Sequence, residues 1–349
     1  MNPHTLVARL DSAGDVLLQG PAIRAVAAGS RRVSLLCSPR GEAAAALLPG
    51  VDEVLVHAAE WIDHDPRPVG RAAVMGLVDR LAALRLDAAV ISTSFHQSPL
   101  PLALLLRMAG VPRVGAISVD YPGSLLDVRH LVDDDVHEVE RSLSLAAAMG
   151  FHPLPGDDGR LRVRRDGSLP TAAAELAPFT VVHPGAAAPA RAWSPDRHAA
   201  LVDRLVARGG RVVVTGGGGE IALCAGVAGP RRPAVLSLAG RTDLATLAEV
   251  VAAADVVVCG NTGPAHLAAA VGTPVVSLFA PVVPAVRWRP WKVPHALLGW
   301  QDAPCAGTRA RECPVSGHPC LDGMDPELVV AAIDALLHAA AAGRTSLIS

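Results

Sequence analysis

Residues 255–266 read DVVVCGNTGPAH. Asp255–Cys259 is a short apolar run that predicts a buried strand, and small residues follow it as a loop. Pro264 suits the first position of a helix, where the missing N–H of proline costs nothing. A strand, a tight loop and a helix start in this order indicate a βα unit of a parallel sheet. The free amides of Thr262, Gly263 and Ala265 would converge on one point, as helix N-termini do around an anion.

His266 stands on the first turn of the same predicted helix. A single helical histidine is more often packed in a core than used as a ligand. Glycine, proline and histidine directly after a strand nevertheless favour anion binding at Asn261, Thr262, Gly263 and His266.

Apolar runs alternate with amphipathic stretches on both sides of this segment, which is typical of α/β proteins. We predict strands at Thr5–Arg9, Val33–Cys37, Glu53–His57 and Asp87–Ile91, near Val114, and at Thr180–His183, Arg211–Thr215, Ala234–Leu238, Asp255–Cys259 and Pro274–Phe279. We predict helices at Asp15–Ala28, Glu42–Leu48, Arg71–Leu84, Gln97–Met108, Asp135–Met149, Pro195–Arg208, Glu220–Ala228, Leu244–Ala253, Ala265–Val271 and Pro326–Ala341.

The alternation is interrupted once, at Gly150–Pro178, where prolines, glycines and the charged run Arg160–Asp166 indicate a linker. At about 150 residues per domain, 349 residues make roughly two domains. We therefore expect two doubly wound, Rossmann-like α/β domains, residues 1–165 and 166–349, that face a central cleft. The last helix can return to pack on the first domain.

Composition narrows the class of protein. The chain is 51 % hydrophobic and 18 % charged, with a formal net charge of −2, so it is neither disordered nor basic enough to bind nucleic acid. Arg9, Asp11 and Asp15 interrupt the first apolar stretch, so no secretory signal forms. Glycines and prolines break the uncharged stretch 256–286, so no transmembrane segment is expected. We expect a cytoplasmic protein; peripheral membrane contact stays open, without a basic amphipathic helix to support it.

Ligands of such sheets bind outside the carboxyl ends of the strands, which directs attention to the loops after strands. The first such loop reads Asp11-Ser12-Ala13-Gly14-Asp15. Asp15 either charges a helix N-terminus or serves as a general base in a cleft.

Two loops of the second half have the same position. His183-Pro184-Gly185 begins a small-residue loop that reaches Arg191 and Trp193. Its amides and Arg191 suit phosphate groups, although a surface arginine and a packed Trp193 would explain the same pattern. Thr215 is followed by a run of four glycines, which starts at Gly216 and ends before Glu220. Such a run allows a ligand to approach the backbone closely. The spacing matches neither a dinucleotide fingerprint nor a P-loop.

Six cysteines are present, and no disulfides are expected without a secretory signal. Cys37, Cys224 and Cys259 stand in apolar runs and are interpreted as core residues. Cys305, Cys313, His318 and Cys320 would suffice for a tetrahedral zinc site, but the spacing lacks a C-x-x-C pair. Reduced thiols packed in an irregular segment are the favoured interpretation.

In combination and in this order, these segments resemble glycosyltransferase family 9, the heptosyltransferase-like enzymes, from Leu6 to about Leu337. Four stretches carry the resemblance: Arg9–Leu18 with Pro21–Arg24, His183–Gly185 with Arg191 and Trp193, Gly216–Glu220, and Asn261–Leu267. Many members have aspartate where this chain has Asn261, which removes a negative charge near the expected pyrophosphate.

The resemblance implies a GT-B fold and a metal-independent, inverting transfer without a cofactor, usually from ADP-heptose. The donor would bind mainly the second domain, and the usual acceptor is a lipopolysaccharide core. Asp15 matches the position of the general base, Arg191 a basic position near the donor phosphates, and Glu220 a ribose-binding carboxylate. The resemblance and the loops together predict catalytic roles for Asp15 and Arg191 and donor binding by Gly14, His183, Gly185, Thr215, Gly216, Glu220, Asn261, Thr262, Gly263 and His266.

Two other functions remain open on this fold. One is a nucleotide-sugar epimerase or hydrolase, and the other is a non-catalytic nucleotide-sugar binding protein, against which the presence of Asp15 argues. The acceptor, a glycan or small molecule, is not readable from the sequence. Ser92–Ser98 and Ile117–Val128 are candidate acceptor loops, because they follow strands of the first domain.

Overall fold

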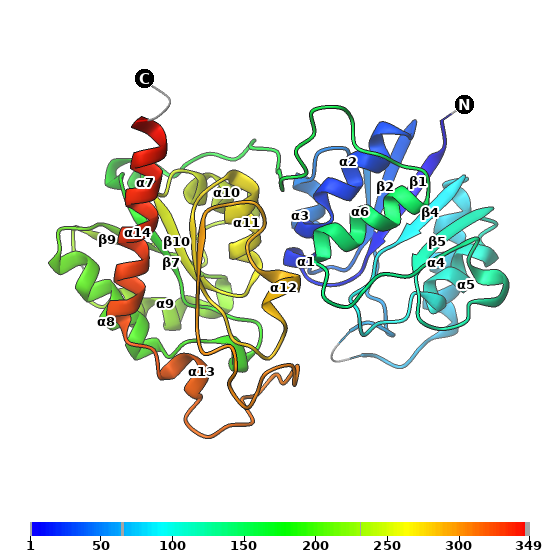
Figure 1. The fold of residues 1–349 in the computed structure, drawn as a ribbon. Helices are drawn as coiled ribbons and strands as arrows, with labels where there is room; N and C mark the ends of the chain where they lie inside the picture. The colour runs from blue at the N-terminus through cyan, green and yellow to red at the C-terminus, as the bar shows by residue number, and fades with distance from the viewer. Residues whose placement is uncertain (1, 64–65, 231, 346–349) are drawn as a thin grey trace. The chain divides into compact units, whose positions relative to one another are not determined.

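The computed structural model describes residues 2–63, 66–230 and 232–345. The chain divides into two compact units, residues 1–164 (unit 1) and residues 165–349 (unit 2). Each unit contains a six-stranded sheet with helices, as Figure 1 shows. The predicted α/β class with two doubly wound domains is therefore confirmed.

The sheet of unit 1 has the strand order β3-β2-β1-β4-β5-β6, and every neighbouring pair is parallel. This is the strand order of the Rossmann fold, in which the direction of winding reverses between β1 and β4. The strands are β1 (His4–Arg9), β2 (Arg32–Cys37), β3 (Glu53–Val56), β4 (Ala88–Ile91), β5 (Arg113–Ile117) and β6 (Val128–His130). The helices are α1 (Ala13–Leu18), α2 (Gly20–Ala28), α3 (Glu42–Leu47), α4 (Arg71–Ala83), α5 (Leu100–Met108) and α6 (Glu138–Ala148), with the 3₁₀ turn η1 (Gly123–Leu125).

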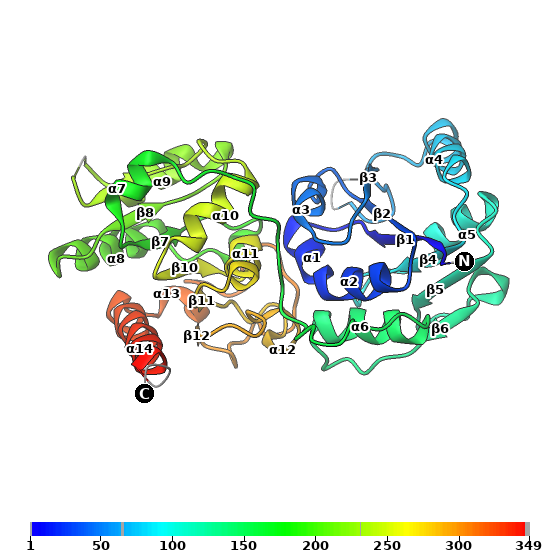
Figure 2. The same cartoon turned by 90° about the horizontal axis from the view of Figure 1, so that it is seen from above.

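Helices cover both faces of this sheet. Successive strand residues point to opposite faces, so each strand contributes side chains to the packing on both sides. Leu6, Ala8 and Leu10 share an apolar core with residues of α4 and α5. Arg9 has the opposite parity, and its side chain contacts residues of α1 and α6. Figure 2 shows α6 beside α2, in agreement with their contacts.

One predicted helix of unit 1, Asp15–Ala28, is wrong as a single element. The structure ends α1 at Leu18 and starts α2 at Gly20. Pro21 is the reason, because it has no N–H to donate and its ring clashes with the carbonyl four residues earlier. The break leaves α1 as a separate short helix that carries Asp15.

The sheet of unit 2 has the order β12-β11-β10-β7-β8-β9, again all parallel. Counted from its first strand, this is the same Rossmann order, with the reversal between β7 and β10. The strands are β7 (Thr180–His183), β8 (Val212–Val214), β9 (Val235–Ser237), β10 (Val256–Gly260), β11 (Val275–Leu278) and β12 (His295–Leu298). The helices are α7 (Thr171–Leu176), α8 (Pro195–Ala207), α9 (Ile221–Ala228), α10 (Leu244–Ala252), α11 (Gly263–Val271), α12 (Ala285–Trp288), α13 (Pro319–Asp322) and α14 (Pro326–Thr345), with the 3₁₀ turns η2 (Pro189–Arg191) and η3 (Gly218–Glu220).

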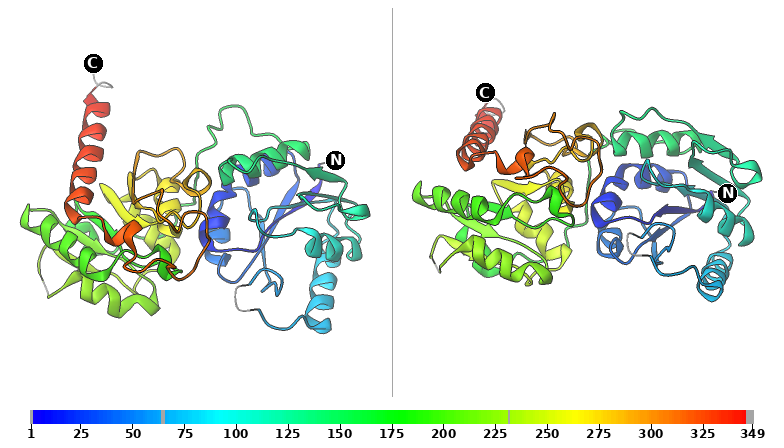
Figure 3. Two further views of the ribbon diagram at one scale, coloured as in Figure 1. Left: turned by 60° about the horizontal axis from the view of Figure 1, so that its bottom comes forward. Right: turned by 90° about the horizontal axis from the view of Figure 1, so that it is seen from below.

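The C-terminal helix α14 packs on α8 and beside β10, β11 and β12 of its own unit. Figure 3 shows α14 in red next to the other helices of unit 2. Val329, Val330 and Ile333 of α14 belong to the core that also includes Val256 and Val258 of β10.

The predicted secondary structure needs correction at three places. Strands β6 and β12 were not predicted, and the expected linker Gly150–Pro178 contains helix α7. Both strands lie at sheet edges, where they pair with one neighbour only and their residues are half-buried or exposed. An edge strand lacks the continuous apolar run that makes a central parallel strand recognisable.

Candidate active site

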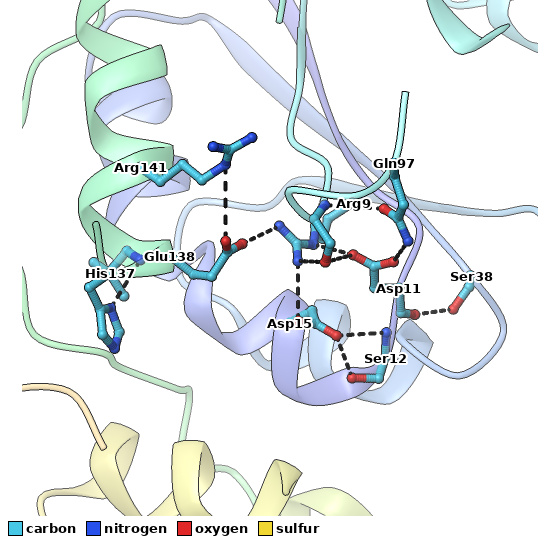
Figure 4. A network of polar contacts seen from close by, with 11 residues as sticks. Arg9, Asp11, Ser12, Asp15, Ser38, Gln97, His137, Glu138 and Arg141 are labelled. Carbon is cyan, nitrogen blue, oxygen red and sulfur yellow. Dashed lines mark hydrogen bonds and ion pairs between the residues drawn. The ribbon is translucent and has the colours of Figure 1, made fainter. Parts of the chain in front are cut away.

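Unit 1 places a charged cluster at the carboxyl end of β1. Arg9, the last residue of that strand, has a side chain that is only 1 % exposed. Its guanidinium contacts three carboxylates, those of Asp11, Asp15 and Glu138, and these four residues are called the Arg9 cluster. The contacts are Nε to Asp11 Oδ2 at 2.7 Å, Nη2 to Asp15 Oδ1 at 3.1 Å and Nη1 to Glu138 Oε2 at 3.0 Å (Figure 4).

Asp15 lies at the start of α1, as one of the two predicted roles requires. Its Oδ2 accepts hydrogen bonds from the backbone N–H and the hydroxyl of Ser12, at 3.3 and 2.7 Å, at the start of α1. Its Oδ1 accepts from Arg9. The Asp15 side chain is 19 % exposed, against 9 % for Asp11 and 1 % for Glu138, so it is the carboxylate of the cluster most accessible to a substrate.

The Arg9 cluster contains one positive side chain and three carboxylates. Burial opposes the charge of Arg9, but the three carboxylates outweigh burial and raise the pKa of Arg9 above its usual value. Burial raises the pKa of Glu138, and the guanidiniums of Arg9 and Arg141 offset this only in part. One buried cation thus serves three carboxylates, of which Glu138 is the most buried.

Polar side chains from the loop after β4 complete the cluster. The Ser94 hydroxyl bonds to Asp11 and also accepts from Arg9, at 3.1 and 2.8 Å, and the Gln97 amide donates to Asp11 (Figure 4). The structure thus assembles the cluster at the β1/β4 reversal, where ligands of Rossmann-type sheets bind. Sequence reasoning did not identify Arg9 or Glu138 as functional. A charge at the end of a buried strand was the available signal for Arg9; no local pattern marked Glu138.

Unit 2 gathers most of the predicted donor residues at its own reversal, between β7 and β10. His183 ends β7, and its Nδ1 lies 3.0 Å from the Thr215 hydroxyl after β8. His183 Nε2 lies 3.9 Å from Glu220 Oε2, which also accepts from the backbone N–H of Gly217 at 2.7 Å. Burial lowers the pKa of His183, and Glu220 opposes this. Burial thus favours the neutral form of the His183 ring, in which one nitrogen donates a hydrogen bond and the other accepts one.

Two glycines make this arrangement possible. A Cβ at Gly185 would lie 1.9 Å from Glu220 Oε1, and one at Gly216 would lie 2.5 Å from Cys224 Sγ. Any larger residue at position 185 would displace the Glu220 carboxylate. The two glycines are thus required by close packing around Glu220 rather than by backbone conformation.

The N-terminus of α11 carries the third part of the site. Thr262 is the residue before the helix, and Pro264 occupies an early helical position, as predicted. Asn261 is 6 % exposed, and neither its Oδ1 nor its Nδ2 has a hydrogen-bond partner among the residues that the structure describes. Buried amides are normally paired, so Asn261 departs from the usual pattern. His266 is buried on the first turn of α11.

Arg191 and Gly14, two further residues of the predicted site, belong to different units. A Cβ at Gly260 would lie 3.0 Å from the Arg191 carbonyl oxygen, so the structure packs the Arg191 backbone against the start of the loop that carries Asn261. Gly14 lies in α1 of unit 1 and is buried. Trp193 is buried and packs on the His198 ring at 4.9 Å, as the core interpretation predicted.

The cysteine segment does not assemble the four zinc ligands that the sequence left possible. The Cys305 and Cys320 thiols are neighbours in the core, and burial together with Cys305 raises the pKa of Cys320 to about 12. The His318 Nε2 lies instead 3.2 Å from the Ala190 carbonyl oxygen. Within residues 2–63, 66–230 and 232–345, no three His, Cys, Asp or Glu side chains are placed to hold a metal ion. Cys37, Cys224 and Cys259 are buried, as predicted.

Across the same described ranges, the structure contains no helix whose length and apolar character would let it cross a membrane.

Each of the two units has an all-parallel sheet in the Rossmann strand order, with polar residues at the point where the strand order reverses. This is the α/β fold of GT-B glycosyltransferases. The chain belongs to glycosyltransferase family 9 (heptosyltransferase), whose sequence model matches residues 89–318.

Several proteins that are similar to this chain in sequence or in structure are named heptosyltransferases. Lipopolysaccharide heptosyltransferase 3 of Escherichia coli is 32 % identical over 172 residues, which cover 47 % of this chain and 48 % of that protein. The chain thus matches about half the length of this curated relative. The solved structure of E. coli ADP-heptose lps heptosyltransferase II matches with a TM-score of 0.72 at 20 % identity, over 96 % of this chain and 98 % of that one. The E. coli heptosyltransferase WaaC, solved with ADP-2-deoxy-2-fluoro heptose, matches with a TM-score of 0.69 at 20 % identity, over 84 % and 93 % of the two chains.

Proposed function

We propose that this protein is an inverting glycosyltransferase that moves a heptose from ADP-heptose to a hydroxyl group of a glycan or small-molecule acceptor. The observation that carries the proposal is the Asp15 carboxylate. It is held by Arg9 and Ser12 at the Rossmann reversal of unit 1, and it is the most exposed carboxylate of the Arg9 cluster. A heptose donor is favoured by the family and by the donor analogue in the WaaC structure.

The proposed reaction is one displacement at the anomeric carbon of the donor. The acceptor oxygen forms the new C–O bond while the bond to the diphosphate breaks on the opposite side of the ring, which inverts the configuration. Asp15 accepts the proton of the attacking hydroxyl, and the diphosphate departs with the bonding electrons.

Unit 2 would hold the donor. The amides at the N-terminus of α11, with His266 and Arg191, would stabilise the negative charge that develops on the diphosphate. Asn261 would supply two hydrogen-bonding atoms that have no partner within the protein. Glu220 would accept hydrogen bonds from ribose hydroxyls, since its carboxylate is fixed by Gly217.

We propose that neither a metal nor a cofactor takes part, and that the reaction occurs in the cytoplasm, in the synthesis of a lipopolysaccharide core or another surface glycan. Within the Arg9 cluster, Asp11 and Glu138 share the guanidinium that contacts Asp15, so Arg9 would orient the proposed base.

Calorimetric titration of the full chain with ADP, UDP, GDP and dTDP tests the donor assignment. Each titration is run with and without EDTA. We expect ADP to bind most tightly and EDTA to leave its Kd unchanged. A tighter Kd for another nucleotide would refute the ADP donor, and loss of binding in EDTA would refute metal independence.

A further inference from the structure

The cysteine segment of unit 2, residues 305–322, contacts a loop that the proposed reaction uses. That loop, residues 184–194, joins β7 to α8 and contains the 3₁₀ turn η2 with Arg191; it is called the η2 loop. Hydrogen bonds between the two segments run from Ala190 N–H to the Arg311 carbonyl at 2.8 Å, from Arg311 Nη2 to the Ala187 carbonyl at 3.2 Å, from His318 Nε2 to the Ala190 carbonyl at 3.2 Å and from Ser194 N–H to Asp322 Oδ1 at 3.0 Å.

Ala190 is held by the cysteine segment on both sides. Its N–H and its C=O are each bonded to that segment, and the residue is fully buried. A buried backbone whose donor and acceptor are both bonded cannot rotate without losing a bond that water does not replace. The next residue in the chain is Arg191, so the cysteine segment fixes the backbone that carries the Arg191 side chain.

His318 makes its bond to Ala190 from an unusual backbone conformation. A carbonyl oxygen only accepts hydrogen bonds, so Nε2 of His318 is the donor. The backbone of His318 has φ +46° and ψ +52°, in the left-handed region that non-glycine residues seldom adopt. Such a conformation persists where the surrounding structure holds it. The anchor here is α13, which starts directly after His318 and places Cys320 and Leu321 in the core of unit 2.

Asp322 holds the opposite side of the His318 ring. Its Oδ2 lies 3.6 Å from His318 Nδ1, while its Oδ1 accepts the hydrogen bond from Ser194 N–H. One carboxylate therefore orients the ring and also holds the end of the η2 loop that leads into α8. The His318 side chain is only 14 % exposed, so it is largely shielded from solvent.

We propose that His318 is a positioning residue of the donor site. Through the Ala190 carbonyl it fixes the η2 loop, and thereby places Arg191 for the diphosphate of the donor. The inference rests on the proposed function, in which Arg191 stabilises the charge on that diphosphate. The histidine of the cysteine segment thus orients a loop, and the buried thiol of Cys320 serves to anchor the helix that follows it.

The test compares His318→Asn with His318→Gln, two amides that differ by one methylene group. Asparagine tolerates the left-handed conformation, but its amide reaches only the position of Nδ1. Glutamine extends to the position of Nε2, so its N–H can still donate to Ala190. In calorimetric titration of the full chain, we expect His318→Asn to raise the Kd of ADP about three- to thirtyfold and His318→Gln to stay within about twofold of wild type.

A double-mutant cycle shows whether His318 acts through Arg191. Arg191→Gln should raise the Kd of ADP about tenfold or more, because it removes a charged donor to phosphate. In that background, His318→Asn should add less than about twofold. A histidine that only stabilised the fold would lower the Tm of His318→Asn and leave unchanged the Kd measured well below that Tm.

His295→Asn is the matched control. His295 is a half-buried histidine of the same unit, and its Nδ1 lies 2.9 Å from the Val293 carbonyl oxygen. It is the first residue of β12, at the end of the sheet opposite to the loops that follow the strands. This variant should therefore retain the wild-type Kd of ADP.

An unchanged Kd in His318→Asn would overturn the proposal. So would an equal loss in His318→Gln, or a full further loss when His318→Asn is added to Arg191→Gln. ADP binding that depends on Arg191 but not on His318 would refute this inference and leave the proposed function intact. An unchanged Kd in Arg191→Gln would refute the role of Arg191 and this inference with it, and a failure of all four nucleotides to bind would refute the proposed function as well.

Discussion

The two ends of the Arg9–Glu138 ion pair should respond very differently to substitution. Arg9→Gln leaves three carboxylates close together without their common cation. Removing one partner of a buried pair costs about 3–5 kcal/mol. At roughly 2–4 °C per kcal/mol for a domain of this size, we expect the Tm of Arg9→Gln to fall by about 6–20 °C.

Glu138→Gln should cost less than about 1 kcal/mol. Glutamine has the same shape, and its amide oxygen can still accept from Arg9. Arg9 keeps Asp11 and Asp15 as counter-charges. Burial already raises the pKa of Glu138, so the substitution removes a charge that the folded state holds at a cost.

The way in which the stability of Arg9→Gln changes with pH is a second, independent test of the prediction. In folded Arg9→Gln the clustered carboxyl groups have pKa values above those of the unfolded chain, about 3.9–4.3. The folded variant then binds more protons than the unfolded chain, so its stability falls as pH rises through the raised pKa values. The deficit relative to wild type should disappear below about pH 4, where the carboxyl groups are protonated in both states.

Scanning calorimetry of the full chain, from about one pH unit below pH 4 up to pH 8, measures the two losses of Tm and their dependence on pH. Arg31→Gln is the control, because Arg31 pairs with Asp87 on the surface of the same unit and should contribute at most about 1 kcal/mol. Equal losses of Tm in Arg9→Gln and Glu138→Gln would refute this reasoning, as would an Arg9→Gln deficit that does not depend on pH.

Three further predictions concern the reaction and the donor. Asp15→Asn should lower kcat by about 10²–10⁴ and leave the Kd of ADP unchanged; normal turnover would remove Asp15 from the role of base. Gly185→Ala should weaken ADP binding about tenfold or more, since its Cβ would lie 1.9 Å from Glu220 Oε1 and displace that carboxylate; an unchanged Kd in calorimetry would show that Glu220 does not contact the nucleotide. Asn261→Leu should raise the Tm of the unliganded protein by removing two unpaired buried atoms, and weaken ADP binding; a lower Tm with normal binding would contradict the role of Asn261.

The order of strands and helices was largely readable because buried parallel strands have continuous apolar runs. DVVVC at residues 255–259 is such a run, and β10 forms there. Prediction failed at β6 and β12, which are short edge strands with half-buried or exposed residues. It also failed between α1 and α2, where Pro21 ends a hydrophobic pattern that otherwise continues at helical spacing.

The individual residues of the site were predicted unevenly. Asp15, Glu220 and Asn261 were predicted because each lies between the end of a strand and the first turn of the next helix, which is a local pattern; their roles stay predictions. Arg9 and Glu138 are separated by 129 positions, and only the packing of α6 beside the end of β1 brings them together.

The sequence by itself determined two α/β units, the position of the loops at strand ends, and the family. These features depend on periodicity and on short motifs, and both are local. The tertiary structure alone decided that three carboxylates share one buried guanidinium, that the Glu220 carboxylate occupies the space beside Gly185, and that the Asn261 amide has no partner among the described residues. Charge balance and hydrogen-bond satisfaction are properties of groups distant in the chain, so only the folded arrangement establishes them.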